Sequence, residues 1–253
     1  MVLKGQMWTL LNPAAGLVLF EYSPSRATIN ARLMLAGYKG LLMADAYTAY
    51  RKLAKSSGIP VTLLSCWAHA RRRFLDSQDH NNPDPVVREV ISRIAELYRI
   101  EKQIKGQSPR KKKKVRKRSI TLLRSLKKYL ELKIQLYAPK EAVAAAIQYC
   151  LNHWEALSAY THHGIAPIGN NATERAIRPI TVSRKNVLFL GSVEHAAGAS
   201  LMYSLMHCCQ LQSIDPMVWL LDVMKKIETY PKNQLADLLP HKWKRNQNNK
   251  PPS

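Results

Sequence analysis

Short apolar runs in the first quarter of the chain have the length and composition of β-strands. They cover residues 6–11, 17–22, 40–45 and 60–66, and glycine, proline or polar residues bound them. The pentapeptide NPAAG separates the first two runs, so we predict that they form a hairpin.

Two helices are predicted between these strands. The first follows Ser23 and Ser25, either of which is a candidate cap, and it ends at Gly37. The second covers 46–58 and ends at Gly58. The order strand pair, helix, strand, helix, strand is typical of a mixed sheet, so the sequence predicts an α/β fold.

From Cys66 onward the spacing of apolar residues is helical. The exceptions are a strand-like NVLFLG at 186–191 and a polar tail, KWKRNQNNKPPS, which ends the chain. The predicted helices cover 67–77, 84–105, 119–136, 139–160, a helix that opens near Asn171, 194–210 and 215–229.

The charge balance points to a polyanionic partner. Lys and Arg number 39 against 17 Asp and Glu, a formal net charge of +22, which favours nucleic acid over an anionic membrane surface. Eight of the nine residues at 110–118 are basic, and such blocks are commonly disordered and bind phosphates without sequence preference. No apolar run reaches 18 residues and the first residues lack a signal-peptide core, so we expect a cytoplasmic, nucleoid-associated protein without a membrane partner.

Two acids occupy positions that suit either structure or chemistry. Asp45 ends the apolar run GLLMAD, where a carboxylate either caps the following helix or binds a metal at the sheet edge. Glu174 lies in NNATERAIRP, three residues after Asn171, a spacing similar to a capping box. Capping does not explain the basic residues around Glu174, whereas a metal-binding carboxylate beside phosphate-binding cations does.

Other residue clusters carry a functional and an ordinary interpretation. The pairs Cys66/His69 and Cys150/His153 have a spacing that zinc ligands can adopt, but apolar neighbours and the lack of a CxxC knuckle favour simple burial. The basic residues are candidates for DNA contact, or else belong to solvated faces. These candidates are Arg71, Arg72 and Arg73, then Lys111, Lys112, Lys113 and Lys114, and finally Arg175, Arg178, Arg184 and Lys185.

Several motifs in order resemble the insertion-sequence-66 family of transposases. They are GYKGLLMADAYTAY, LLSCWAHARRRF, NNATERAIRPITVSRKNVLFLGS, DPMVWLLDVM and LLPHKW, and they span about residues 5 to 243. The resemblance implies a DDE transposase with a ribonuclease H-like sheet, in which three acids bind two divalent ions, Mg²⁺ or Mn²⁺. By position, Asp45 matches the second acid and Glu174 the third, so both are implied to be catalytic metal ligands.

The resemblance also implies partners and a division of the chain. The partners would be the DNA of the transposon ends and target, possible accessory transposition proteins, and further copies of the chain when active. The implied parts are the start of the catalytic core at 1–66, a helical insertion at 67–162 that holds the basic run 110–118, the rest of the core with C-terminal helices at 163–230, and a tail at 231–253.

Some positions depart from the family pattern. The family's first acid lies on a strand before the hairpin, and the earliest acid here is Glu21. Gly169 takes the place of a usual Asp, and Ala46 that of a usual Gly. We therefore expect an amino-terminally truncated transposase that has lost its first strand. The alternative is a catalytically inactive remnant that still binds DNA.

Overall fold

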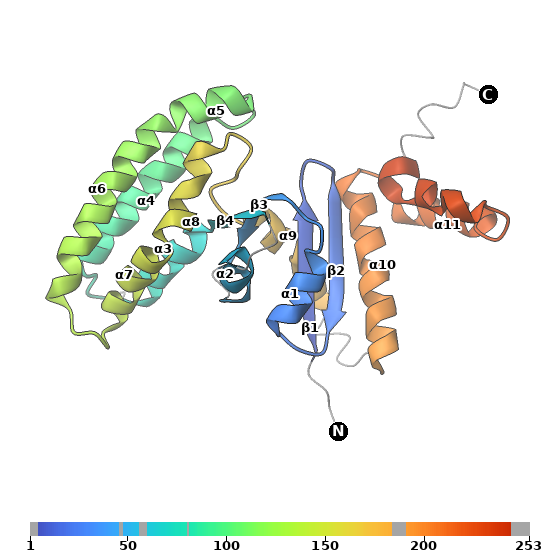
Figure 1. Cartoon of the computed structure of the whole chain (residues 1–253), viewed down its shortest axis with the longest axis horizontal. Coiled ribbons are helices and arrows are strands. Elements are labelled where there is room, and N and C mark those ends of the chain that lie inside the picture. The colour runs from blue at the N-terminus through green and yellow to red at the C-terminus, as the bar shows by residue number, and fades with distance from the viewer. Residues whose placement is uncertain (1–4, 46–47, 56–59, 80, 184–190, 244–253) are drawn as a thin grey trace. The chain divides into compact units, whose positions relative to one another are not determined.

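The computed structural model describes residues 5–45, 48–55, 60–79, 81–183 and 191–243 (Figure 1). Their contacts divide the chain into two compact units. One consists of Met1–Arg26 with Asn171–Ser253, and the other of Ala27–Asn170. We call them the hairpin unit and the bundle unit. The division assigns the hairpin and the NNATER helix to one unit, although about 140 residues of sequence lie between them.

The bundle unit begins with a parallel pair of strands and the helices that follow them. Strand β3 (Gly40–Ala44) pairs with β4 (Val61–Ser65), so that Gly40 lies opposite Val61 and Ala44 opposite Ser65. Helices α1 (Thr28–Met34) and α2 (Thr48–Lys55) contact each other, and α2 also contacts β4. The predicted strands and helices of this region are confirmed, but Gly58 lies outside the described residues.

Helices make up the rest of the bundle unit. Each of α3, α4, α6 and α7 contacts two of the others in a closed ring, so together they form a four-helix arrangement (Figure 1). The short α5 leads into α6. The bounds are α3 Trp67–Asp76, α4 Pro85–Gln103, α5 Pro109–Val115, α6 Lys117–Lys133, η1 Ile134–Leu136, α7 Ala142–Asn152, α8 Trp154–Ser158 and η2 Ala159–His162.

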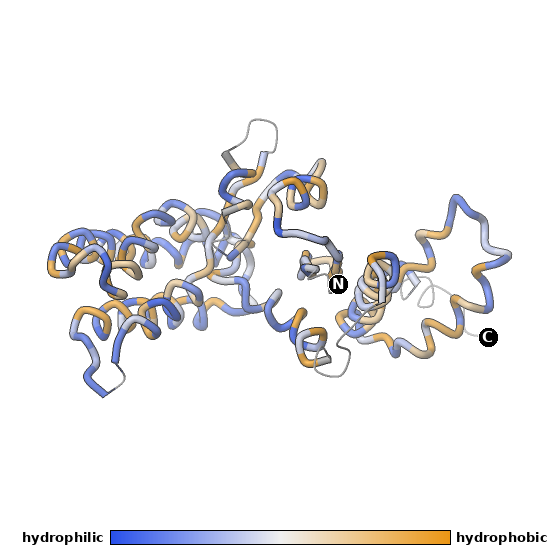
Figure 2. Tube along the Cα trace, turned by 90° about the horizontal axis from the view of Figure 1, so that it is seen from below, coloured by the Kyte–Doolittle hydropathy of each residue, from blue (hydrophilic) through white to orange (hydrophobic). Residues whose placement is uncertain are grey.

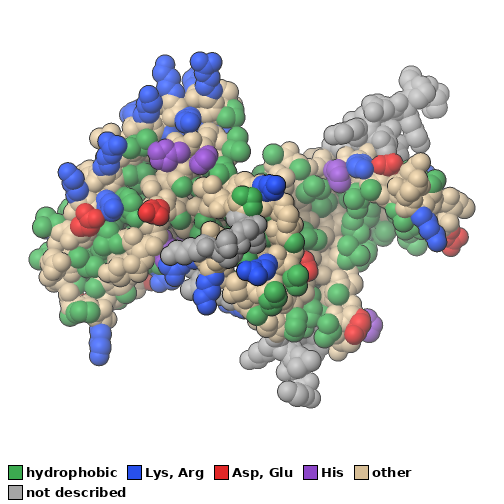
Figure 3. All heavy atoms as spheres, in the orientation of Figure 1, with side chains coloured by type: hydrophobic (Ala, Val, Ile, Leu, Met, Phe, Trp, Pro, Cys, Tyr) green, Lys and Arg blue, Asp and Glu red, His purple; other side chains and the backbone are tan. Residues whose placement is uncertain are grey.

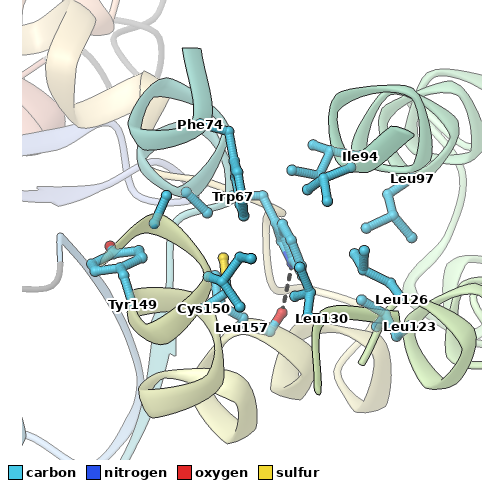
Figure 4. Close-up of a cluster of buried hydrophobic side chains, with 14 of the residues drawn as sticks. Trp67, Phe74, Ile94, Leu97, Leu123, Leu126, Leu130, Tyr149, Cys150 and Leu157 are labelled. Atoms are coloured by element: carbon cyan, nitrogen blue, oxygen red, sulfur yellow. Dashed lines mark hydrogen bonds between the residues drawn. The ribbon is translucent and has the colours of Figure 1, made fainter. Parts of the chain in front are cut away.

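Trp67 lies at the centre of the core of this unit. It is fully buried against side chains from several helices, and its indole N–H donates to the Leu157 carbonyl at 2.8 Å (Figure 4). Along these helices apolar and polar positions alternate, as the colouring of the trace shows (Figure 2), so each presents one apolar stripe to the core. The labelled core side chains include Phe74, Ile94 and Leu130.

The hairpin unit packs two helices on an antiparallel strand pair. Strand β1 (Gln6–Asn12) pairs with β2 (Leu17–Ser23) in full register, which confirms the predicted hairpin. Helix α9 (Asn171–Ser183) contacts β1, and α10 (Val193–Leu211) contacts β2. Helix α11 (Pro216–Lys226) and η3 (Lys232–Leu238) follow and build a smaller core around Trp219.

Helix α10 satisfies the backbone of β2 along the edge that faces away from β1. The Phe20 amide donates to the Ser204 hydroxyl at 2.8 Å, and that hydroxyl lies 3.3 Å from the Phe20 carbonyl oxygen. One turn later, Cys208 exchanges the same two contacts with Val18 at 3.4 and 3.3 Å. Because these polar groups are buried, their pairing avoids the cost of an unsatisfied strand edge.

Three features differ from the sequence prediction or lie beyond it. Neither Ser23 nor Ser25 caps α1, because Ala27 precedes the helix and Ser23 ends β2, where its hydroxyl donates to the Ser25 carbonyl at 2.9 Å. The basic run is helical and not disordered: α5 starts at Pro109 after the Ser108 cap. The strand-like NVLFLG falls almost entirely in 184–190, outside the described residues.

The α/β class predicted from the sequence is confirmed, with helix predominating. The strands that the structure describes form two separate two-stranded sheets, β1–β2 and β3–β4. A single ribonuclease H-like sheet therefore remains a prediction at this stage.

The core of the bundle unit should be sensitive to one truncation on α6. We predict that Leu130→Ala, at a fully buried position, lowers the free energy of unfolding by about 2–5 kcal/mol because it leaves a cavity. Leu132→Ala on the same helix, where the side chain is 67% exposed, should change it by less than about 0.5 kcal/mol. Urea unfolding of both variants measures the difference, and equal losses would contradict this packing.

Candidate functional site

Asp45 follows β3 directly and is exposed. Its neighbour Ala44 pairs with Ser65 at the end of β4, and parallel strands end at the same edge of a sheet. Cys66, the residue after β4, therefore lies beside Asp45 at this edge. The carboxyl ends of parallel strands are the usual place for ligands in α/β proteins.

Residues 168–170 are attached at this edge by backbone contacts. The Trp67 amide donates to the Ile168 carbonyl at 3.2 Å, and the Asn170 amide donates to the Cys66 sulfur at 3.3 Å. Gly169 allows the approach, because a β-carbon there would lie 2.9 Å from the same sulfur. A residue with a β-carbon could not be accommodated at position 169 beside Cys66 without a shift of one of them.

The Cys66 thiol has an unusual environment for a fully buried cysteine. Burial alone would raise the pKa of this thiol, but hydrogen bonds with His69 and with the Asn170 amide together bring the pKa below its ordinary value. Cys66 also precedes the first residue of α3, where helix amide groups favour negative charge. The sulfur is therefore a good hydrogen-bond acceptor for the Asn170 amide.

Glu174 lies in the first turn of α9. Asn171 is the first helical residue of α9, and Glu174 follows it by three residues in the same turn. The Asn170 amide oxygen is buried and has no hydrogen-bond partner among the described residues. On α9, Ile177 and Ile180 pack against the hairpin core, which leaves Arg175 and Arg178 exposed and Glu174 half-buried.

The two predicted acids belong to different compact units. Asp45 lies in the bundle unit and Glu174 in the hairpin unit. Their common metal site thus stays a prediction from the sequence. Arg184 and Lys185, which the sequence also assigns to DNA contact, lie outside the described residues.

Exposed basic residues gather at one end of the bundle unit. Figure 3 shows Lys and Arg side chains clustered there, over α5 and its neighbours. In the sequence no acid occurs between Glu101 and Glu131, so little opposes their charge locally. Lys112 is half-buried. We call the exposed set the basic end; it comprises Lys102, Lys105, Arg110, Lys111, Lys113, Lys114, Lys117 and Arg118.

The three arginines of α3 are all exposed. Arg73 differs from Arg71 and Arg72 because its guanidinium stacks over the Tyr149 ring, 4.2 Å from the ring centre. A stacked guanidinium is already held by the protein. Arg71 and Arg72 keep the freedom that a phosphate contact requires.

Arg116 has a role that sequence reasoning missed. It belongs to the basic run but its side chain is only 2% exposed, and it forms an ion pair with Glu101 at 2.6 Å. A signal for this exists in the sequence: the buried residues of α6 are Ser119, Leu123, Leu126 and Leu130, and the same spacing extended by one step toward the amino terminus reaches Arg116.

Comparison with known proteins gives the family. The model of the Transposase IS66 family matches residues 2–198 of the chain. The chain belongs to the IS66 transposase family. Among curated proteins of Sinorhizobium fredii (strain NBRC 101917 / NGR234), uncharacterized proteins y4jD, y4hP and y4qI are 37%, 32% and 31% identical to it.

These relatives are longer than the IS66-family chain described here. The matches cover 93%, 95% and 90% of this chain but 47%, 48% and 43% of the respective relatives. The chain thus spans about half the length of the curated relatives it matches. No solved structure matches it significantly.

The cysteine and histidine pairs of this IS66-family chain pack in the bundle unit. Burial raises the pKa of the Cys150 thiol to about 12, and His153 places its Nδ1 2.7 Å from the Tyr149 carbonyl oxygen. In the described ranges no group of three or more His, Cys, Asp or Glu could hold a metal ion. None of the helices described there is long and apolar enough to span a membrane.

The contact between Cys66 and Asn170 predicts a specific exchange pattern. Cys66→Ala removes the acceptor of the Asn170 amide, so we expect hydrogen exchange at that amide to accelerate by about tenfold, the equivalent of one weak hydrogen bond. Cys66→Ser keeps an acceptor and should stay near the native rate. Exchange measured by NMR tests this, and identical rates in the alanine and serine variants would contradict the contact.

Proposed function

We propose that this chain forms the part of a metal-dependent DNA transposase in which Asp45 and Glu174 bind one divalent cation. Membership of the IS66 transposase family supports the reaction class. The observation that carries the proposal is the attachment of Asn170 to Cys66, at the edge of the sheet where Asp45 lies.

Simple lengths make a shared site feasible. Neighbouring strands lie about 4.8 Å apart, so Asp45 is one strand spacing from Cys66. Glu174 follows Asn170 by four residues, so the chain between them can span no more than about 14 Å. This short link is what makes a site shared with Asp45 feasible, and the shared site itself is the proposal.

The available donors fit a hard cation. Asp45 and Glu174 offer carboxylate oxygens, and the Asn170 side chain offers a buried amide oxygen without a partner among the described residues. Oxygen ligands of this kind suit Mg²⁺ or Mn²⁺. When bound, such an ion would activate water or a 3′-hydroxyl for displacement at a DNA phosphate. The exposed Arg175 and Arg178 would hold the phosphates of the strand that enters.

We also propose that the two small sheets belong to one ribonuclease H-like sheet. Helix α10 already occupies the outer edge of β2 through Ser204 and Cys208, so an added strand would pair with β1. In the proposed sheet the same strand also pairs with β3 and joins both pairs. By the family resemblance, this strand carries the first acid of the triad.

The alternative proposal is a DNA-binding chain without strand cleavage. It is favoured by the basic end, which presents eight exposed cations in a stretch of sequence that has no acid between Glu101 and Glu131. In both proposals the basic end and the arginines of α3 and α9 contact the DNA backbone, so binding alone does not distinguish them.

A cleavage assay distinguishes the two proposals. With Mg²⁺ or Mn²⁺ and DNA that carries the element's ends, we expect cleavage by a version extended at its amino-terminal end and none by the 253-residue chain. Glu174→Gln in the extended version should lower the rate about a hundredfold or more, because a contributor to transition-state stabilisation is lost. Glu228→Gln, at an exposed acid after α11, is the matched control.

Two outcomes would contradict this account. Full activity of the extended version with Glu174→Gln would exclude Glu174 as a metal ligand. Robust cleavage by the 253-residue chain would mean that another acid, with Glu21 the nearest candidate, takes the first position. Failure of every version to cleave, with DNA binding retained, would select the alternative proposal.

DNA binding should depend strongly on salt and weakly on sequence. Each phosphate contact contributes about −0.9 to the slope of log K against log salt. We therefore expect the exposed lysine substitutions Lys111→Ala, Lys113→Ala and Lys114→Ala, combined, to reduce the slope by about 3 on every duplex tested. Lys232→Ala, at an exposed residue of η3, should leave it unchanged. Fluorescence anisotropy measures the slopes, and a salt-independent affinity would rule out a phosphate interface.

A further inference from the structure

Arg116 is the buried member of a run of exposed cations. Lys114 and Lys117 on either side of it are exposed, whereas the Arg116 side chain is 2% exposed. A buried guanidinium must be paired and fully hydrogen-bonded, since an isolated buried charge is very costly. The structure meets this requirement completely.

Every N–H group of the Arg116 guanidinium has an acceptor. Nε donates to Glu101 Oε1 at 2.8 Å and one Nη2 hydrogen donates to Glu101 Oε2 at 2.6 Å, a bidentate pair. The other three donors reach backbone carbonyls of one segment. These are the carbonyls of Tyr160 and His163, at 3.0 and 2.6 Å from Nη1, and that of Ala166, at 2.8 Å from Nη2.

A second contact joins the same two parts of the chain. Gly164 lies so close to the start of α5 that a β-carbon on it would overlap the Pro109 backbone. The segment 160–166 is thus held against α5 at Pro109 and against its end at Arg116. Since five donors are already used and the side chain is buried, Arg116 has nothing left to offer a DNA phosphate.

The held segment leads directly to α9. Two residues after Ala166, the Ile168 carbonyl accepts from the Trp67 amide, and the Asn170 amide then donates to Cys66. The next residue, Asn171, begins the helix that carries Glu174. Contacts at 160–166 therefore restrict the path by which the chain reaches the sheet edge beside Asp45.

We propose that Arg116 is a positioning residue and that it does not contact DNA. It holds segment 160–166, which precedes the helix that carries Glu174, against the end of α5. The proposal rests on the proposed function for the role of Glu174, but the attachment itself stands on contacts within the bundle unit. Lysine cannot replace this arginine, because one ammonium cannot supply the planar fork that reaches Glu101 and three carbonyls together.

The test compares Arg116→Lys with Lys113→Met. In the free protein we expect Arg116→Lys to accelerate exchange of the Trp67 and Asn170 amides about tenfold or more, while amides of the buried residues Val87 and Val90 of α4, in the same unit, keep their rates. The salt slope of DNA binding should stay at the native value for Arg116→Lys. Lys113→Met should do the opposite, with native exchange and a slope reduced by about 0.9.

A further variant separates attachment from charge. Gly164→Ala changes no charge but pushes segment 160–166 away from Pro109, so it should reproduce the exchange pattern of Arg116→Lys with a native slope. In the extended version, both variants should lower the cleavage rate at saturating DNA and leave DNA affinity unchanged.

Several results would overturn the proposal. Native exchange at Trp67 and Asn170 in Arg116→Lys would show that no positioning occurs, and a slope reduced as in Lys113→Met would show a phosphate contact. Equal acceleration at Val87 and Val90 of α4 would mean general destabilisation of the bundle unit instead of local attachment. If even the native chain fails to bind DNA, the proposed function fails, while the exchange pattern of the free protein still decides the role of Arg116.

Discussion

The attachment of residues 160–170 to α3 and α5 is the constraint on which the candidate site depends. Its strongest part is the Arg116 guanidinium, which is buried with Glu101 and satisfies three carbonyls of a segment that otherwise has little regular structure. Its last part is the Asn170 amide on the Cys66 sulfur. This segment leads directly into α9, the helix that carries Glu174, so the proposed site depends on how the segment is held.

The charge distribution of the bundle unit follows from the same arrangement. Glu101 is the last acid before a long acid-free stretch, and it is used by Arg116. The cations of the basic end are consequently left without acidic partners in the sequence nearby. Self-repulsion of this kind destabilises an isolated domain but favours a polyanionic ligand. The four-helix core around Trp67 offsets the repulsion through apolar burial.

Much of the fold could be predicted from periodicity, because each strand and each long helix has a clear apolar pattern. The hairpin around NPAAG and the helix that opens at Asn171 were both predictable in this way. The helical state of α5 was not, because four consecutive lysines carry no apolar period and composition alone suggests disorder. The signal for this helix in the sequence is its start, where Ser108 is the cap and Pro109 the first helical residue.

The sequence singles out two acids whose role stays a prediction, but it does not reveal the contacts that hold residues 160–170. Asp45 and Glu174 stand in motifs that a family resemblance identifies, whereas the partners of Arg116 are main-chain carbonyls, which no residue type marks. The Asn170 contact with Cys66 joins residues 104 positions apart. In the sequence, Cys66 has the surroundings of an ordinary buried residue, so its role as a hydrogen-bond acceptor could not be predicted. The prediction that Ser23 or Ser25 caps α1 was wrong. Strand β2 extends to Ser23, and Ala27 is the residue that precedes the helix.

The most direct test of a metal site formed by Asp45 and Glu174 is a crystal structure with Mn²⁺, with the ion located by its anomalous scattering. We expect one manganese peak at the carboxyl ends of β3 and β4, with an oxygen of each of the two carboxylates about 2.0–2.2 Å away, the range of hard cations of this size. A manganese ion bound elsewhere, with the two carboxylates more than about 10 Å apart, would contradict it, because ligands of one ion must lie within a few ångströms of each other.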